Sequence, residues 1–570
     1  MNRTQLKLFF ATAITTLFLF VTVGSQATSL HPVRGNNGIV ASSSRIASEV
    51  GIDILRQGGN AVDAAIATAF AMAVTWPTAG NIGGGGFLVY HGADGEATTF
   101  DFREKAPLAS TKTMYLDDEG NVRNNSNHDG ILAVGVPGTV AGMALAHQRL
   151  GSMAWADLLQ PAIELARDGI PISWHLHDAF KRLNSHWDLY PSSAKVFRKA
   201  DGSFYQPGDT WQQPDLARTL ERIQADGKDG FYQGETARLI ADFMAANEGI
   251  ITLEDLDRYE AREREPIRGT YRGYDIVSMP PPSSGGVVLV QMLNILEGFD
   301  LGEIGHNSAL YLHLLTESMR RAYADRANYL GDPDFNEDMP LDKLTSKDHA
   351  ARQRESIVFH SASESDPARF AQIYESEETT HFSVVDKDGN MVSLTYTLEN
   401  GYGSKIVVEG AGFLLNNEMG DFNARPGVTN ERGAIGTEPN QIRPEQRMLS
   451  SMTPTIVAKD GVPVFATGTP GGKTIINTTM QTILNVIDHD MNIARAISAP
   501  RIHHQWLPDS TRMEAARISA DTIRLYEQRG HTVRPSGQIG AAMGVYRDLE
   551  TGILSGAADP RAEDGGAVAY

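Results

Sequence analysis

The sequence predicts an α+β fold, and its 570 residues allow either one large layered body or several domains. Alternating runs at 381–386 and 391–397 flank an Asp-Gly turn, which predicts a β-hairpin. Residues 61–76 are apolar on nearly all sides, so we expect a helix that is covered on several faces. Residues 462–467 predict a strand, which a Gly-Gly turn joins to a helix. Buried helices and strands of this kind stack in layers around shared cores.

Further elements follow from periodicity and from capping signals. We expect strands at 87–90 and 97–102, the first of them after a run of four glycines. These glycines precede a strand and do not join a strand to a helix, so they are not a dinucleotide-binding fingerprint. Helical patterns cover residues 42–57, 155–244, 253–259, 287–296 and 308–330.

Composition excludes several classes of protein. The net charge of −20 argues against nucleic-acid binding, which normally requires a basic face. The chain has no cysteine, which excludes a thiol nucleophile, a disulfide framework and a cysteine-ligated metal. The same absence suits an oxidising compartment, where stray thiols are a liability.

The N-terminus has the pattern of a secretory signal peptide at residues 1–27. Arg3 and Lys7 precede a mostly apolar stretch at 8–23, and Ser25-Gln26-Ala27 offers a small-residue cleavage site. An uncleaved membrane anchor is the alternative. We expect cleavage, a secreted protein, and no membrane association afterwards.

Thr379 stands where an acidic stretch at 375–378 meets the first strand of the hairpin. If the peptide bond before it is cut, this residue gains a free α-amine beside its own hydroxyl. Such an amine can act as the base that a hydroxyl nucleophile needs. Its unperturbed pKa of about 7.7–8.0 leaves a usable unprotonated fraction at neutral pH. The alternative is an ordinary threonine at the start of a strand.

Two other positions carry candidate chemistry. The turn at Gly471-Gly472 fails as a phosphate-binding P-loop, because Gly468 is one residue too close to Gly472-Lys473-Thr474. It leaves two backbone N–H groups at a helix start, where an oxyanion can bind; a plain helix start is the alternative. Arg103 ends a predicted strand, as either a surface ion pair or a bidentate carboxylate clamp.

Motifs for metal and serine chemistry are missing. His503 and His504 are adjacent, so on a strand they face opposite ways and cannot both bind one metal. The chain contains no His-Glu-x-x-His motif and no Gly-x-Ser-x-Gly elbow. We therefore expect no metal.

Together these pieces resemble the γ-glutamyltranspeptidases of the bacterial periplasmic type, over essentially the whole chain after the signal peptide. The resemblance runs from Asn60-Ala61-Val62-Asp63-Ala64, through Thr379-Thr380-His381, to Asp559-Pro560-Arg561. It implies an N-terminal-nucleophile hydrolase with a four-layer αββα sandwich. It also implies a precursor that cuts itself before Thr379, so that a large subunit (28–378) and a small catalytic subunit (379–570) form one heterodimeric body.

The resemblance also implies roles for single residues. Thr379 matches the nucleophile, Thr397 matches the threonine that hydrogen-bonds it, and Gly471 and Gly472 match the oxyanion glycines. A second set matches the residues that bind the two charged groups of the γ-glutamyl end: Arg103, Ser450 and Ser451 for the α-carboxylate, and Glu418 and Asp421 for the α-ammonium. Residues 426–447 match the substrate lid, and no cofactor is required.

Two positions depart from the family pattern. Glu399 stands where the family usually has asparagine, and Arg432 stands where bacterial members often have an aromatic residue on the lid. An ionised carboxylate only accepts hydrogen bonds, whereas asparagine also donates. We expect Glu399 to join the ammonium-binding carboxylates; the alternative is that it faces solvent and that Asn400 takes the polar role.

The implied reaction is transfer of the γ-glutamyl group of glutathione and related compounds to water, an amino acid or a dipeptide acceptor. The nearest alternative is a cephalosporin or glutaryl acylase on the same scaffold, which would not need the ammonium acceptors. A secreted solute-binding protein that never cleaves is the alternative from another class.

Overall fold

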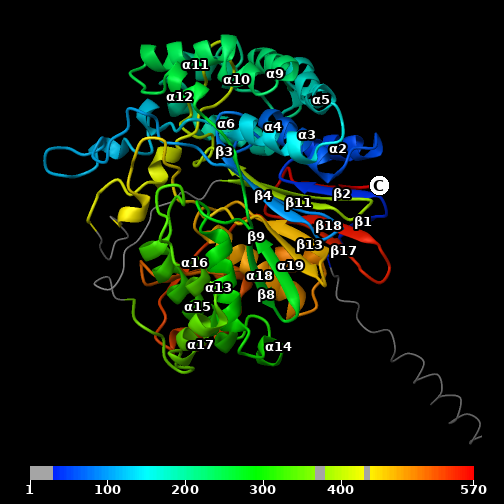
Figure 1. Cartoon of the computed structure of the whole chain (residues 1–570), viewed down its shortest axis with the longest axis vertical. Helices are drawn as coiled ribbons and strands as arrows, with labels where there is room; N and C mark the ends of the chain where they lie inside the picture. The colour runs from blue at the N-terminus through cyan, green and yellow to red at the C-terminus, as the bar shows by residue number, and fades with distance from the viewer. Residues whose placement is uncertain (1–29, 366–378, 429–436) are drawn as a thin grey trace, which may run out of the picture. The chain divides into compact units, whose positions relative to one another are not determined.

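Two seven-stranded antiparallel sheets lie face to face in residues Pro32–Tyr570, and helices cover the outer side of each (Figure 1). The computed structural model describes residues 30–365, 379–428 and 437–570. Pro32–Tyr570 form one compact unit. The predicted signal peptide, 1–27, lies outside the described residues. None of the described helices combines the length and the apolar character that crossing a membrane requires.

Each sheet mixes strands from both sides of Thr379. In spatial order, with hydrogen-bonded strands next to each other, the first sheet contains β19 (Gly566–Ala569), β2 (Gly38–Ser42), β10 (Thr380–Asp386), β11 (Met391–Thr397), β3 (Gly85–His91), β4 (Ala97–Phe102) and β7 (Arg262–Arg264). The second contains β1 (Val33–Gly35), β18 (Leu554–Ala558), β17 (Met543–Arg547), β13 (Val462–Gly468), β12 (Thr455–Lys459), β9 (Tyr274–Ser278) and β8 (Ile267–Tyr271). Two small sheets pair β5 (Ile170–Pro171) with β6 (Thr210–Trp211), and β14 (Ile502–His503) with β15 (Thr511–Met513) and β16 (Val533–Pro535).

The helices form the two outer layers (Figure 1). Those on the side of the first sheet are α2 (Arg45–Arg56), α3 (Ala61–Thr75), α4 (Thr139–Leu150), α5 (Trp155–Asp168), α6 (Trp174–Arg182), α7 (Asn184–Trp187), α8 (Pro191–Phe197), α9 (Pro214–Asp226), α10 (Asp229–Tyr232), α11 (Gly234–Ala246) and α12 (Leu253–Asp257). The others are α13 (Gly285–Leu296), α14 (Leu301–Ile304), α15 (Ala309–Tyr329), α16 (Leu341–Leu344), α17 (Lys347–Glu355), α18 (Thr474–Ile487), α19 (Ile493–Ser498) and α20 (Ala520–Glu527).

Side-chain alternation along the strands explains why four layers form. On β10, Phe382 and Val384 point into the core shared with α2, α3 and α4, whereas Val385 points into the core between the sheets. Because successive residues of a strand face opposite sides, one buried strand supplies both cores. A third core lies between the second sheet and α13, α15 and α18. The predicted αββα sandwich is therefore confirmed.

The central hairpin is held by its turn. Asp386 Oδ1 accepts from the backbone N–H groups of Asp388, Gly389 and Asn390, each at 3.0 Å. Gly389 has φ of 92°, a conformation that favours glycine. The second oxygen of Asp386 accepts from Ala61 N at 3.0 Å, at the start of α3. One carboxylate thus fixes both the hairpin turn and the buried apolar helix that packs on the hairpin.

Candidate active site

A small cavity of about 20 Å³ gathers nine of the ten predicted site residues. Its lining consists of Arg103, Thr379, Thr397, Glu399, Glu418, Asp421, Ser450, Ser451, Met452, Gly472 and Ile475. These residues come from the ends of β4, β10 and β11, from the loops that follow, and from the start of α18. The volume is that of about one water molecule, so a γ-glutamyl group requires the lining side chains to move.

Thr379 lies directly before β10, with an exposed fraction of 6%. Thr380 pairs with Tyr396 in the register of β10 and β11, so Thr379 comes level with Thr397. The Thr397 hydroxyl oxygen accepts from Glu399 N at 2.9 Å, and Asn81 Nδ2 donates to Thr397 O at 2.8 Å. The strand ladder therefore brings together the two threonines predicted to act as a pair.

The glycine turn has the geometry of an anion site. Gly471 and Gly472 have φ of 133° and 52°, and α18 begins two residues later. Within the described residues, their N–H groups donate to no backbone carbonyl. Gly472 lines the cavity whereas Gly471 does not. Donors held at a helix start are suited to stabilising an oxyanion.

Arg103 is fully buried and binds two of the predicted ammonium acceptors. Its Nη1 pairs with Glu418 and its Nη2 with Asp421. The guanidinium also donates to Met448 O from Nε at 3.2 Å and to Leu449 O from Nη2 at 3.4 Å. The fork is therefore held in a fixed plane between two carboxylates. Because Arg103 is buried, the alternative interpretation of a surface ion pair is wrong.

The carboxyl groups around Arg103 outnumber its single charge. Burial raises the pKa of Glu418 well above its usual range, with repulsion from Glu104 and Glu399 adding to the rise and Arg103 opposing it. Burial likewise raises the pKa of Glu104 to about 7, again opposed by Arg103. Glu104 Oε2 lies 3.5 Å from Arg103 Nη1. At neutral pH this cluster therefore keeps protons that exposed carboxyl groups would have lost.

Glu399 is buried and lines the cavity, so it does not face solvent. Its φ is 78°, an uncommon conformation for a residue other than glycine. Asn400 Nδ2 donates to Glu399 Oε2 at 2.6 Å, and His128 Nδ1 lies 3.3 Å from Glu399 Oε1. The side chain is thus oriented by neighbours on either side and adds a carboxylate close to Glu418.

Ser450 and Ser451 are held by the second sheet's helical layer. Ser450 Oγ accepts from Met452 N at 3.1 Å, while Arg326 Nη2, on α15, donates to Ser451 Oγ at 2.9 Å. Arg326 Nε also donates to Ser284 Oγ at 2.6 Å.

Of the predicted lid, 426–447, residues 429–436 lie outside the described residues, and Arg432 with them.

His381 of the Thr-x-His motif lies off the cavity, between the sheets. Its ring nitrogens bond the hydroxyls of Thr395 at 2.8 Å and Ser383 at 2.9 Å. Burial lowers the pKa of His381 to about 3, so the ring is neutral. Gly468 passes over the ring, where a Cβ would come within 2.5 Å of it. This histidine therefore packs between the two sheets, bonded to the first and in contact with Gly468 of the second.

One other group of side chains brings potential metal ligands together. His313, Glu317 and His531 bring ligand atoms within 4.8 Å of one another. However, Glu317 already accepts from Arg321 Nη1 at 2.6 Å and from Ser363 N at 3.1 Å. His313 Nδ1 lies 2.8 Å from His531 Nε2, a hydrogen-bond distance. Because these atoms already bond one another or cations, the arrangement does not suit a metal ion.

A family model for gamma-glutamyltranspeptidase matches residues 47–569. The chain belongs to the γ-glutamyltranspeptidase family. It is 46% identical over 546 residues to the glutathione hydrolase proenzyme of Escherichia coli (strain K12), covering 95% of this chain and 94% of that protein. It is 37% identical over 538 residues to the acylase ACY 1 proenzyme of Pseudomonas sp. (strain SE83), covering 93% of each. A crystal structure of the cephalosporin acylase from Bacillus halodurans has a TM-score of 0.84 and 28% identity, covering 96% of this chain and 98% of that one.

Sequence reasoning missed three side chains that surround the site of this γ-glutamyltranspeptidase family member. Glu104 directly follows Arg103 in the sequence, and this adjacency could have indicated that Glu104 lies near the site. Arg326 lies on a helix more than 120 residues from Ser451 in the sequence, and His128 lies in a polar loop. Nothing local in the sequence distinguishes these last two from surface residues.

Proposed function

We propose that this chain is a self-processing γ-glutamyltransferase and glutathione hydrolase whose nucleophile is Thr379. The observation that carries the proposal is the cavity itself. A strand-start threonine, Gly472 of the glycine turn, and an arginine between two carboxylates line one small space. A γ-glutamyl amide has a carbonyl, which the threonine and the glycine N–H groups would contact. It also has a zwitterionic end, whose two charges the arginine and the two carboxylates would bind.

Substrate binding is an exchange of ion pairs. Before binding, Arg103 pairs with both Glu418 and Asp421. The substrate α-carboxylate takes one face of the Arg103 fork, and the α-ammonium takes the place of the guanidinium beside the two acids. Because each lost ion pair is replaced by a new one, the buried charges are never left unpaired, which would cost several kcal/mol. Ser450 and Ser451 supply hydroxyls to the α-carboxylate.

The reaction then follows from the position of Thr379. Its hydroxyl oxygen attacks the γ-carbonyl carbon, its α-amine takes the hydroxyl proton, and the N–H groups of Gly471 and Gly472 stabilise the oxyanion. Collapse breaks the C–N bond, and the amine returns the proton to the leaving nitrogen. Water then hydrolyses the γ-glutamyl ester to glutamate, or the amine of an amino acid or dipeptide attacks it to form a new γ-glutamyl amide.

Maturation is proposed to divide the chain into residues 28–378 and 379–570, after secretion to the periplasm and loss of residues 1–27. If 62.0 kDa is shared evenly over 570 residues, the two subunits weigh about 38 and about 21 kDa. A denaturing gel and N-terminal sequencing of both bands test this. A chain that stays whole would fit a solute-binding protein instead.

The decisive variant is Thr379→Ala, with Thr380→Val as the neighbouring control. Thr379→Ala should remain one uncut chain without activity, because both steps use that oxygen. Thr380, which contacts Ser43 Oγ at 3.2 Å, does not line the cavity, so its variant should still be cut. Two subunits in Thr379→Ala, with an N-terminus at residue 379, would exclude self-cleavage by this residue.

An acylase is the second candidate, since two of the similar proteins carry that name. Two matched substrates separate the candidates: a γ-glutamyl anilide and a glutaryl anilide, which lacks only the α-ammonium. Glu418 and Asp421 next to Arg103 favour the ammonium-bearing substrate. We expect a much higher kcat/KM for the γ-glutamyl anilide, and a preference for the glutaryl anilide would instead support the acylase.

A further inference from the structure

The glycine turn of the active site rests on a second loop. Thr469 Oγ accepts from Ala541 N at 3.0 Å and donates to Pro470 O at 2.7 Å. Gly540 has φ of 63°, and a Cβ there would lie 2.6 Å from Thr469 Oγ and 3.0 Å from Pro470 O. A Cβ on Gly471 would in turn lie 3.4 Å from Gly540 Cα. The loop therefore supports the turn without a gap.

Buried ionic side chains fix both ends of this loop. At one end, Arg501 Nη1 donates to Ile539 O at 2.7 Å, and Glu514 Oε1 accepts from Ile539 N at 3.0 Å. At the other end, Asp559 Oδ2 accepts from Ala542 N at 3.1 Å. Both backbone groups of Ile539 and the N–H of Ala542 are thus bonded to charged groups, which make the stronger kind of hydrogen bond.

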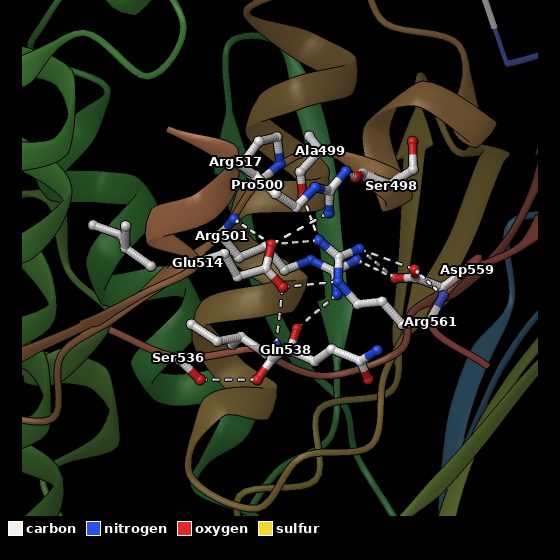
Figure 2. Close-up of polar contacts among 12 residues, drawn as sticks. Ser498, Ala499, Pro500, Arg501, Glu514, Arg517, Ser536, Gln538, Asp559 and Arg561 are labelled. Carbon is white, nitrogen blue, oxygen red and sulfur yellow. Dashed lines mark hydrogen bonds and ion pairs between the residues drawn. The ribbon is translucent and has the colours of Figure 1, made fainter. Parts of the chain in front are cut away.

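The charges that hold the loop also hold one another. Arg561 bonds Glu514 through Nε at 2.8 Å and Asp559 through Nη1 at 2.9 Å, and Arg501 Nη2 bonds Asp559 at 2.5 Å (Figure 2). The side chains of these four residues are at most 6% exposed. A buried network of this kind is rigid, because a side chain that moved away would leave its buried partners with fewer opposite charges.

We propose that Arg501, Glu514, Asp559 and Arg561 are positioning residues for the oxyanion turn, acting through residues 539–542. The network sets the loop, and the loop sets the direction of the Gly471 and Gly472 N–H groups. Oxyanion stabilisation depends on donors that are already in place before charge develops. The inference rests on the proposed function, since it assigns those N–H groups to the γ-carbonyl oxygen.

The first test introduces one methyl group into the loop. Gly540→Ala brings a Cβ against Thr469 and Pro470, whereas Gly552→Ala, with φ of 73°, meets nothing within 4 Å. Both changes carry the strain of a positive φ, and only the first displaces the turn. On the γ-glutamyl anilide, kcat of Gly540→Ala should fall by about tenfold to a hundredfold, with KM within about twofold. Gly552→Ala should keep the wild-type kcat.

The second test removes the hydrogen bonds that join the loop to the turn. Thr469→Val keeps the shape of the side chain but loses its bonds to Ala541 N and Pro470 O, whereas Thr469→Ser keeps the hydroxyl. We expect Thr469→Val to lower kcat with little change in KM, and Thr469→Ser to restore it. A residue that served only stability would lower the melting temperature without this separation of kcat from KM.

The third test reaches the network directly. Glu514→Gln keeps an oxygen for Ile539 N but loses the charge that pairs with Arg561, so kcat should fall at least about threefold, again at constant KM. Wild-type kcat in matured Gly540→Ala and Thr469→Val would overturn the proposal. So would failure of both to mature while Gly552→Ala and Thr469→Ser mature, which would assign the loop to folding. An inactive wild-type enzyme would instead refute the proposed function.

Discussion

Replacing Arg103 by lysine tests the ion-pair exchange most directly. The Arg103 guanidinium uses three nitrogens: Nη1 toward Glu418, Nη2 toward Asp421, and Nε toward Met448 O at 3.2 Å. Lysine keeps the positive charge but has one nitrogen, and it cannot present a planar fork to a carboxylate. The variant should therefore lose at least one charge-assisted bond to the substrate α-carboxylate while keeping the positive charge in the cavity.

The size of the effect follows from that lost bond. A hydrogen bond to a charged group contributes roughly 1.5–3 kcal/mol, and about 1.4 kcal/mol is a factor of ten in an equilibrium constant. We therefore expect KM for glutathione to rise by about tenfold to a hundredfold in Arg103→Lys. The turnover number should change little, because the α-carboxylate binds alike in the ground state and the transition state.

The assay uses matured enzyme, with both subunits confirmed on a gel. Arg264→Lys is the matched control, because Arg264 also makes a bidentate pair, to Asp334 at 3.0 and 2.9 Å, and does not line the cavity. That control should lower the melting temperature and leave KM unchanged. If Arg103→Lys matures with an unchanged KM, Arg103 is not the carboxylate clamp, and the exchange of ion pairs is refuted.

Three further outcomes are expected from residues near the cavity. Glu399→Asn should mature normally and change kcat/KM for γ-glutamyl substrates by more than about threefold. The charge of Glu399 helps raise the pKa of Glu418, so the acid limb of the pH–rate profile should move to lower pH in the variant. An unmoved acid limb, with kcat/KM unchanged from about pH 5 to about pH 9, would return the polar role to Asn400. Glu104→Gln should flatten the dependence of melting temperature on pH: burial raises the pKa of Glu104 from 4.5 to about 7, so its contribution to stability is fully present below about 4.5 and is lost as the pH rises through about 7. Equal pH dependence in the variant and the wild type would show that Glu104 ionises as an exposed acid does. Arg326→Lys should raise KM severalfold, because Ser451 Oγ loses the donor 2.9 Å away, and an unchanged KM would separate Ser451 from substrate binding.

Much of this protein is determined by local sequence. The hairpin of β10 and β11 follows from strict alternation around an Asp-Gly turn, and the buried helix α3 follows from an apolar stretch that begins with a capping box of Asn60 and Asp63. Both signals act over a few residues, so the sequence alone reveals them. The glycine turn at Gly471-Gly472 and the strand-start position of Thr379 are likewise local features.

Tertiary structure decided which charges meet. The chain places Arg103 more than 300 residues before Glu418 and Asp421, and their roles in binding came from resemblance to a family. Only the folded sheets show that these groups already pair with one another in a cavity of about 20 Å³. Burial then moves the pKa of Glu104 to about 7, a shift that no local pattern encodes because it depends on what surrounds the carboxyl group in space.

The same distinction holds for the support of the oxyanion turn. Asp559 and Arg561 belong to a motif that carries the family resemblance, but nothing local in the sequence shows that they and Glu514 meet, and exposure is the usual outcome for charged residues. The fold instead buries their side chains beneath residues 539–542, so each charge loses its hydration and its partners must offset that loss. Local sequence therefore determined the elements and the reacting groups. Packing of distant segments determined which charges are buried together, because desolvation and pairing depend on distance in space and not along the chain.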